Sequence, residues 1–302
     1  MRTVQHPYGS TVLAVIAHVF RGFCMGTADI VPGVSGGTVA LVLGIYERLV
    51  SNVRQGASVL GWLVRINGPR ARRAFNRLEL GFLLPLVTGI GLAILILSSA
   101  LEHLLDEYPV ELSALFFGLV LASVGAVWER LGNRDAVRLA LAVVVAIATF
   151  LALGYRGDTV ADPAWWIVVV SGACAVCAMI LPGISGSFIL VILGMYDNVL
   201  DAVNDREIGT LGLFVVGAAG GLALFAPLLN AGLKRHHDSV MAILIGLMVG
   251  SLRVLWPWPE GVEESGLAWP PGAGDVVIPV LLAMCGAILV FGLTTVDRRL
   301  AR

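Results

Sequence analysis

A short phrase, Pro-Gly-x-Ser-Gly, occurs twice in this sequence, at residues 32–36 and at residues 182–186. Each occurrence lies in an apolar stretch and is followed by Leu-Gly-x-Tyr and a carboxylate, Glu47 in the first case and Asp197 in the second. Proline ends a helix because it has no amide to donate, and glycine lets the backbone turn. A serine can cap the next helix, whose exposed amides and positive dipole end bind phosphate. The two phrases therefore predict a pair of helix breaks that can hold an anionic group.

The candidate substrate-binding residues are the members of these breaks together with the ionisable residues near them, because charged groups inside a membrane are costly and usually functional. In chain order they are Arg21, Asp29, Pro32, Gly33, Ser35, Gly36, Gly37, Glu47, Pro182, Gly183, Ser185, Gly186, Ser187, Asp197 and Arg253. Ser35 and Ser185 are the predicted N-caps. Arg21 and Asp29 have no charged counterpart in the second stretch. We therefore expect Arg21 to be the main counter-ion of a bound phosphate, and Asp29 to compete for that arginine or for a proton.

Each of these assignments has a simpler alternative. Glycines are common where helices pack closely in membranes. Arg21 could only anchor the first helix at the cytoplasmic face, and Arg253 could snorkel outward instead of attracting an external phosphate. Glu47 and Asp197 could simply be solvated at the membrane interfaces.

The composition requires a membrane to position these residues. The chain has 302 residues, of which 58% are hydrophobic and 14% charged, with a mean hydropathy of +0.89. A soluble domain has about 25% charged residues. A net charge of −1 gives no bulk attraction to nucleic acid, so no nucleic-acid partner is expected. Cys174 and Cys177 form a C-x-x-C pair within an apolar stretch, which favours packing over a redox or metal site. We expect no catalytic residue, metal or cofactor.

The predicted fold is an all-α polytopic membrane protein built from two inverted-topology repeats, residues 1–160 and 161–302. Each repeat begins with an apolar region split by the phrase, about 11–47 and 164–197, interpreted as a re-entrant hairpin because arms of about 15 residues are short for a crossing. Three spans follow in each repeat, at about 80–101, 111–128 and 136–155, and at about 208–230, 239–256 and 276–296. Three crossings are an odd number, so the second repeat is inverted. If both arms cross fully instead, the parity is unchanged.

Sequence identities support the repeat. The hairpin regions match at an offset of 150 residues, and the spans match at an offset of 128. At the second offset Gly118, Ser123 and Trp128 meet Gly246, Ser251 and Trp256.

The basic residues predict the orientation. With the N-terminus in the cytoplasm, the inner segments are 1–10, 48–79, 129–138, 231–238 and 297–302, and they hold sixteen of the 20 Lys and Arg residues. The outer segments hold only Arg156 and Arg206, with acids that include Asp106, Glu260, Glu263 and Glu264. Because positive residues stay inside, both termini are expected to be cytoplasmic. The stretch from Arg65 to Arg77 could lie on anionic lipid, or could serve only to fix the orientation.

The stretch GFCMGTADIVPGVSGGTVALVLGIYERL, residues 22–49, resembles the signature of the prokaryotic polyprenyl-phosphate (undecaprenyl-phosphate) translocases, a family long catalogued as a domain of unknown function. LPGISGSFILVILGMY, residues 181–196, is similar to the family's second repeat, and the likeness spans nearly the whole chain. The resemblance implies a flippase in the bacterial cytoplasmic membrane. It would return undecaprenyl phosphate, the carrier lipid of cell-wall building blocks, from the outer to the cytoplasmic leaflet. The candidate residues from Arg21 to Gly37, with Glu47, Pro182, Gly183, Ser185, Gly186 and Asp197, carry over onto the family's motifs.

Two other functions fit parts of the pattern. The G-x-S-G at residues 33–36 and 183–186 matches rhomboid-type intramembrane serine proteases. That chemistry needs a histidine base beside the serine, and only His18 lies within a predicted membrane segment. A small-anion or ion-coupled solute transporter could use the same helix starts. The expected partner is a polyprenyl-phosphate lipid, and the sequence leaves homo-oligomerisation open.

Overall fold

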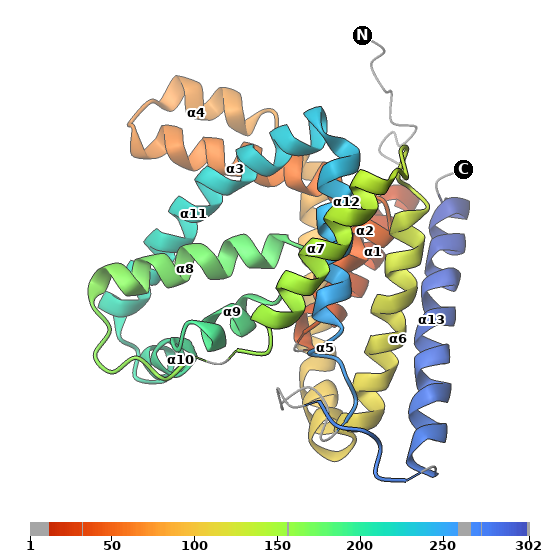
Figure 1. The fold of residues 1–302 in the computed structure, drawn as a ribbon. Helices are drawn as coiled ribbons and strands as arrows, with labels where there is room; N and C mark the ends of the chain where they lie inside the picture. The colour runs from red at the N-terminus through yellow and green to blue at the C-terminus, as the bar shows by residue number, and fades with distance from the viewer. Residues whose placement is uncertain (1–11, 32, 156, 259–266, 273, 301–302) are drawn as a thin grey trace.

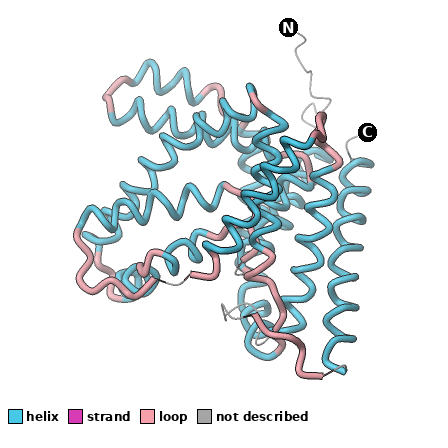
Figure 2. Tube along the Cα trace, in the orientation of Figure 1, coloured by secondary structure: helices cyan, strands magenta, loops and turns pink. Residues whose placement is uncertain are grey.

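The computed structural model describes residues 12–31, 33–155, 157–258, 267–272 and 274–300, and within these ranges the chain is helical with no strand (Figures 1 and 2). Thirteen helices are described. They are α1 Val12–Ile30, α2 Gly36–Val42, α3 Tyr46–Val64, α4 Gly68–Phe75, α5 Leu80–Glu107, α6 Pro109–Trp128, α7 Ala136–Ala152, α8 Trp165–Ile180, α9 Gly186–Ile192, α10 Tyr196–Asn204, α11 Ile208–Arg235, α12 His237–Ser251 and α13 Gly274–Leu300.

Five of the described helices, α1, α5, α6, α11 and α13, are long and apolar enough to cross a bilayer. Helices α7, α8 and α12 are apolar but shorter, and α9 with α10 forms a pair bent by 117° that is either a broken span or a re-entrant loop. The chain is therefore an all-helical multi-span membrane protein. The expected spans at 136–155 and 239–256 are present as the shorter helices α7 and α12.

The two breaks in the apolar regions are present, but the arms that follow them are shorter than the sequence predicted. Helices α2 and α9 have seven residues each rather than about 15. The reason is a second turn in each region, at Gly44 with φ +68° and Gly194 with φ +65°. Residues with a side chain rarely adopt this backbone conformation, which glycine adopts without strain. Each region is thus a helix, a break, a short helix and a sharp turn.

Helix packing repeats at the two offsets found in the sequence. Helix α1 packs along α5, and α8 packs along α11. In both pairs, glycines bring the two backbones together, because a side chain there would collide with a carbonyl of the other helix. The glycine and carbonyl partners are Gly22 with Leu86 and Gly89 with Val19 in the first pair, and Gly172 with Phe214 and Gly217 with Val169 in the second. Residues of α1 and α8 correspond at an offset of 150, and residues of α5 and α11 at an offset of 128.

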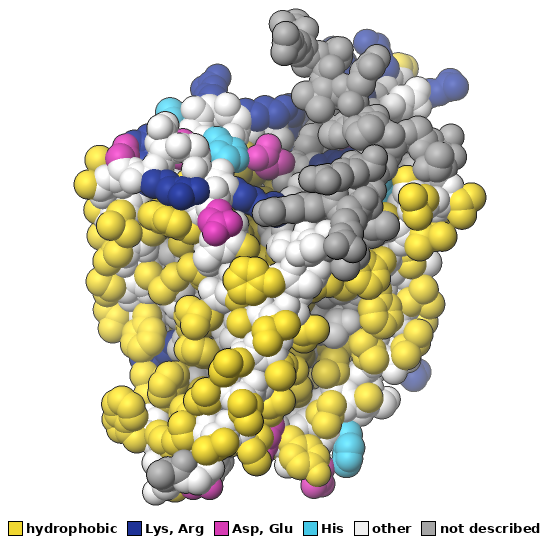
Figure 3. All heavy atoms as spheres, turned by 90° about the vertical axis from the view of Figure 1, so that its right-hand side faces the viewer, with side chains coloured by type: hydrophobic (Ala, Val, Ile, Leu, Met, Phe, Trp, Pro, Cys, Tyr) yellow, Lys and Arg dark blue, Asp and Glu magenta, His cyan; other side chains and the backbone are white. Residues whose placement is uncertain are grey.

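The other two extensive helix pairs join the first half of the chain to the second. Helix α6 packs along α13, and α7 packs along α12. Figure 1 places α4 and the C-terminal end of α13 at one end of the molecule, and the connection between α5 and α6 at the other. On the face drawn in Figure 3, hydrophobic side chains cover the middle and charged side chains lie mostly near the two ends. This is the surface of a protein surrounded by lipid.

Candidate functional site

The two helix breaks touch each other. Three side chains, at the first break and in the helices α2 and α3 that follow it, bind backbone at the second break, and all three are buried. Ser35 Oγ donates to the Leu181 carbonyl at 3.3 Å, the Gly183 amide donates to Thr38 Oγ1 at 3.0 Å, and the Tyr46 hydroxyl donates to the Ile180 carbonyl at 3.1 Å. A helix end leaves its last carbonyls without partners. The first break therefore supplies the groups that satisfy the end of α8.

The Pro-Gly turns themselves require glycine. Gly33 and Gly183 have nearly equal φ angles, +82° and +83°. A side chain at Gly33 would crowd Val254, and one at Gly183 would crowd Met248 and Ser251. Both breaks are therefore backed by α12 and the residues that follow it, so the turn and the close-packing explanations of these glycines both hold.

The start of α2 is occupied by the protein's own oxygens. Asp29 Oδ1 accepts a hydrogen bond from the Gly36 amide at 2.6 Å, and Ser35 Oγ accepts one from the Gly37 amide at 3.1 Å. The prediction that Ser35 is an N-cap is confirmed. A carboxylate at this position balances the positive end of the helix dipole.

The start of α9 differs. Ser185 stands at the N-cap position, but its side chain makes no capping hydrogen bond and instead lies 2.7 Å from the Ser187 hydroxyl. Ser185 is therefore the N-cap residue of α9, as predicted, but its side chain pairs with the Ser187 hydroxyl and not with a backbone amide. The residue equivalent to Asp29 is Met179, so this helix start has no carboxylate from that position.

A cavity of about 360 Å³, called here the break cavity, lies where the two breaks meet. Its polar lining comes from Asp29, Ser35, Ser185, Gly186 and Ser187, and its apolar lining includes Met179 and Phe214. Five of the predicted binding residues, from positions 150 residues apart, are thus brought together around one space. Hydroxyl groups beside apolar walls suit a polar head group attached to an apolar chain.

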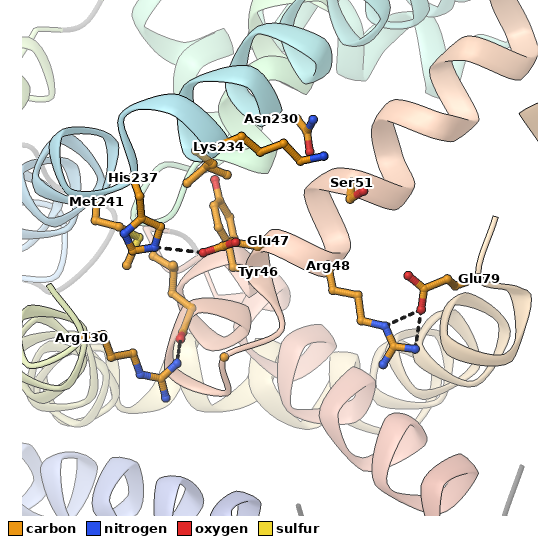
Figure 4. Close-up of a pocket in the computed structure, with 13 residues that line it drawn as sticks. Tyr46, Glu47, Arg48, Ser51, Glu79, Arg130, Asn230, Lys234, His237 and Met241 are labelled. Carbon is orange, nitrogen blue, oxygen red and sulfur yellow. Dashed lines mark hydrogen bonds and ion pairs between the residues drawn. The ribbon is translucent and has the colours of Figure 1, made fainter. Parts of the chain in front are cut away.

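A second cavity of about 530 Å³, called here the polar pocket, lies among α3, α11 and α12 (Figure 4). Of the predicted residues only Glu47 lines it, with its Oε1 2.9 Å from His237 Nε2. Arg48 binds Glu79 at 2.7 Å, and Lys234 also lines the pocket. Both basic residues belong to the predicted inner segments, 48–79 and 231–238, whose charge indicates only the orientation.

Arg130 connects this pocket to the short helix α2 that follows the first break. Its guanidinium donates to the carbonyls of Leu41 and Val42, at the C-terminal end of α2. A cation is favourable at this end of a helix. Gly44 leaves room for it, because a side chain there would lie 2.8 Å from Arg130 Nη1. The equivalent glycine, Gly194, instead accepts a hydrogen bond from the Val160 amide.

The other predicted residues lie apart from the break cavity. Arg21 is buried within α1, with its guanidinium 3.2 Å from His18 Nδ1, and it does not line the cavity. Asp197 accepts a hydrogen bond from Thr159 at the surface. Arg253 lies over the Phe150 ring and lines a third space of about 470 Å³, the aromatic cavity, whose walls include Trp256 and Trp269.

Gly37 and Pro182 are the remaining predicted residues that the structure describes. Gly37 faces the Ile180 carbonyl and the nitrogen of Pro182, so these residues belong to the contact between the breaks. Pro32 lies outside the described residues, as do the predicted outer acids Glu260, Glu263 and Glu264.

The described residues contain no cluster of three or more His, Cys, Asp or Glu that could hold a metal ion. The two serines of the G-x-S-G phrases bond the Leu181 carbonyl and Ser187, respectively, so within the described part of the chain neither hydroxyl is paired with a histidine. This arrangement is not that of a serine nucleophile and its base.

Comparison with known proteins gives consistent matches. A family model described as undecaprenyl phosphate translocase-like matches residues 25–266, a range that contains both breaks and all the predicted binding residues except Arg21. A polyprenyl-phosphate transporter of Vibrio cholerae serotype O1 is 36% identical over 266 residues, covering 86% of this chain and 82% of the relative. A polyprenyl-phosphate transporter of Staphylococcus aureus is 30% identical over 269 residues, covering 83% of this chain and 89% of the relative. No solved structure matches this chain.

Proposed function

This chain belongs to the undecaprenyl phosphate translocase-like family, and we propose that it returns undecaprenyl phosphate or a related polyprenyl phosphate from the outer to the cytoplasmic leaflet for cell-wall precursor synthesis. It is a membrane transporter of polyprenyl phosphate, not an enzyme. The direction of transport and the residues that perform it are the parts we propose. The observation that carries the assignment of the residues is the contact of the two breaks around one cavity with hydroxyl groups and apolar walls.

The proposed architecture is two inverted repeats, residues 1–160 and 161–302, each entering with a re-entrant hairpin. The equivalent glycine contacts of α1 with α5 and of α8 with α11 support it. The cross-pairing of α6 with α13 and α7 with α12 supports it too, because exchanging the repeats converts one pair into the other. Transporters of this kind place the substrate near the membrane centre, between half-helices.

The proposed orientation in a bacterial cytoplasmic membrane has both termini in the cytoplasm. Its support is that the arginine-bearing helix α4 lies at the same end of the molecule as the end of α13, opposite the α5–α6 connection with its acids (Figure 1). In this orientation the polar pocket, lined by residues of the inner segments, opens toward the cytoplasm. Arg70, Arg72 and Arg73 of α4 would then be placed to bind anionic lipid.

The phosphate is proposed to bind in the break cavity, at Ser185 and Ser187 and the start of α9. Asp29 blocks the equivalent position at α2, because its carboxylate already holds the Gly36 amide. We infer that Asp29 makes the two ends unequal, so that a bound anion is repelled from one of them. The proposal that Arg21 is the main counter-ion requires the phosphate to meet α1 outside this cavity, and an Arg21→Gln variant tests it.

The test uses the purified protein in liposomes that contain a short-chain polyprenyl phosphate. An external phosphatase hydrolyses only the lipid in the outer leaflet, so the rate at which the remaining lipid becomes accessible measures transport. Hydrogen bonds to a charged group contribute about 1.5–3 kcal/mol, so Ser185→Ala combined with Ser187→Ala is expected to slow transport by about tenfold or more. Ser58→Ala, whose hydroxyl bonds only the Arg54 carbonyl, is the control.

Two results would contradict the proposal. If the double variant transports at the rate of Ser58→Ala, the break cavity is not the phosphate site. If free phosphate or sulfate at millimolar concentration blocks transport as strongly as excess lipid phosphate, the chain carries small anions instead.

A further inference from the structure

A groove between α6 and α13 faces the surrounding lipid. It encloses about 710 Å³ and is lined mainly by apolar side chains, among them Leu121, Met284 and Phe291, which are at least half exposed. The groove has an identifiable cause. The two helices touch where Gly118 meets the Ala283 carbonyl and Gly286 meets that of Leu115.

The helices leave this contact with open space between them. A side chain added at Gly125, which lines the groove, would meet nothing within 4 Å. Small residues continue along the same stretch, including Ala122, Ala126 and Ala287. The groove thus coincides with a stretch of small residues on both helices, whose side chains are too short to fill it. Helices that pack only for stability bring such residues together.

The groove and the polar pocket are neighbours. Arg130 lines both spaces, so its side chain lies at the boundary between them. The groove also shares Phe117 with the aromatic cavity, and that cavity contains Arg253. The apolar groove therefore borders two spaces that each contain an arginine, Arg130 in the polar pocket and Arg253 in the aromatic cavity.

The charges of the polar pocket leave it suited to an anion. Its two carboxylates are engaged, Glu47 with His237 and Glu79 with Arg48. Lys234 lines the pocket, and no hydrogen bond or ion pair of its ammonium occurs among the described residues. Lys234 lies in the last turn of α11, where the helix dipole favours a cation, and it adds to the positive charge of Arg130.

We propose that this pair of spaces is a second site for the substrate lipid, with the phosphate at Lys234 and Arg130 and the isoprenoid chain in the α6–α13 groove. The inference rests on the proposed function, because only a lipid phosphate needs a cationic pocket joined to an apolar groove. It adds to that function a place where the lipid waits at the inner leaflet after leaving the break cavity. The isoprenoid chain of the lipid stays in contact with the bilayer throughout, because it is too large to be enclosed by the groove.

The experiment measures binding of two probes to the full-length protein in detergent, farnesyl phosphate and farnesol, which share a chain and differ in the phosphate. Gly125→Leu fills the groove and is expected to weaken both probes by about tenfold, because burial of several methylene groups is lost. Lys234→Gln is expected to weaken farnesyl phosphate roughly fivefold, as for an exposed ion pair, and to leave farnesol unchanged. Gly220→Leu is the control, since Gly220 on α11 also has nothing within 4 Å of an added side chain.

Three results overturn this inference. The first is equal binding of both probes by Gly125→Leu and Gly220→Leu. The second is a loss of farnesol binding in Lys234→Gln. The third is equally effective competition by phosphatidylglycerol, which would make the groove a site for ordinary lipid. The liposome assay separates these outcomes from the proposed function. If the double variant of Ser185 and Ser187 transports slowly while Gly125→Leu and Lys234→Gln bind both probes normally, the second site is refuted and the proposed function is not.

Discussion

Replacing Thr38 with valine removes one hydrogen bond between the two breaks while keeping nearly the same side-chain shape. Thr38 is completely buried, and its Oγ1 is the acceptor for the Gly183 amide at 3.0 Å. Gly183 is held at φ +83° against α12, so its amide has little freedom to turn toward another acceptor. A buried donor left without a partner costs about 1–3 kcal/mol. Thr38→Val should therefore favour separation of the breaks by a factor of about 5 to 150.

The measurement is the thermal unfolding midpoint of the purified protein in detergent, combined with the liposome transport rate. A loss of this size lowers the midpoint by about 2–4 °C per kcal/mol in a chain of a few hundred residues. Thr27→Val is the matched control. Its hydroxyl donates to the Phe23 carbonyl within its own helix, so its loss leaves no amide unpaired. Thr38→Ser keeps the acceptor and should recover most of the midpoint.

The reasoning would be refuted if Thr38→Val and Thr27→Val unfolded at the same temperature and transported equally well. That result would mean that the hydrogen bond between Thr38 and Gly183 contributes nothing to the folded state or to transport. A lower midpoint with unchanged transport would keep the structural part of the argument and remove its connection to function.

Two further predictions follow from the backbone and from the orientation. Gly183→Ala should lower the unfolding midpoint by several degrees relative to Gly209→Ala. Of these two glycines, Gly183 has a positive φ and a crowded Cβ position, whereas a side chain at Gly209 meets nothing within 4 Å. Equal midpoints would show that the turn tolerates a side chain. A cysteine at Asp106 should react with an impermeant thiol reagent added outside whole cells and one at Arg72 should not, and the opposite pattern would overturn the proposed orientation.

Much of the arrangement around the breaks could be predicted from the sequence, because it depends on residue types with strong local preferences. Proline and glycine mark the turns, and Ser35 is an N-cap by the usual preference of serine for that position. The offsets of 150 and 128 also predicted equivalence between distant residues, and the glycine contacts of α1 and α8 follow those offsets. The predicted length of the returning arms is wrong, because the chain turns at Gly44 soon after α2 ends. Glycine frequently ends a helix in this way.

The rest could not be predicted, because it depends on which distant surfaces meet. Thr38 is one polar residue in an apolar run, and its hydroxyl accepts a hydrogen bond from the Gly183 amide because the fold brings the two residues together. Arg130 lies in a loop whose charge indicated orientation, and its contact with α2 arises from the packing of α6 beside that helix. The contact between Asp29 and Gly36 spans seven residues across a break, a geometry that helical spacing does not describe.

In the hydrogen bonds between the breaks that the described residues make, side chains of the first half pair with backbone groups of the second. The positions equivalent to Thr38 and Tyr46 are Phe188, which cannot accept a hydrogen bond, and Tyr196, which is 41% exposed. Two copies of the second half could therefore not reproduce the contact. The halves have become obligate unlike partners, so a protein divided between them could reassemble only as a heterodimer, and an exchange of the two phrases within the chain would not be neutral.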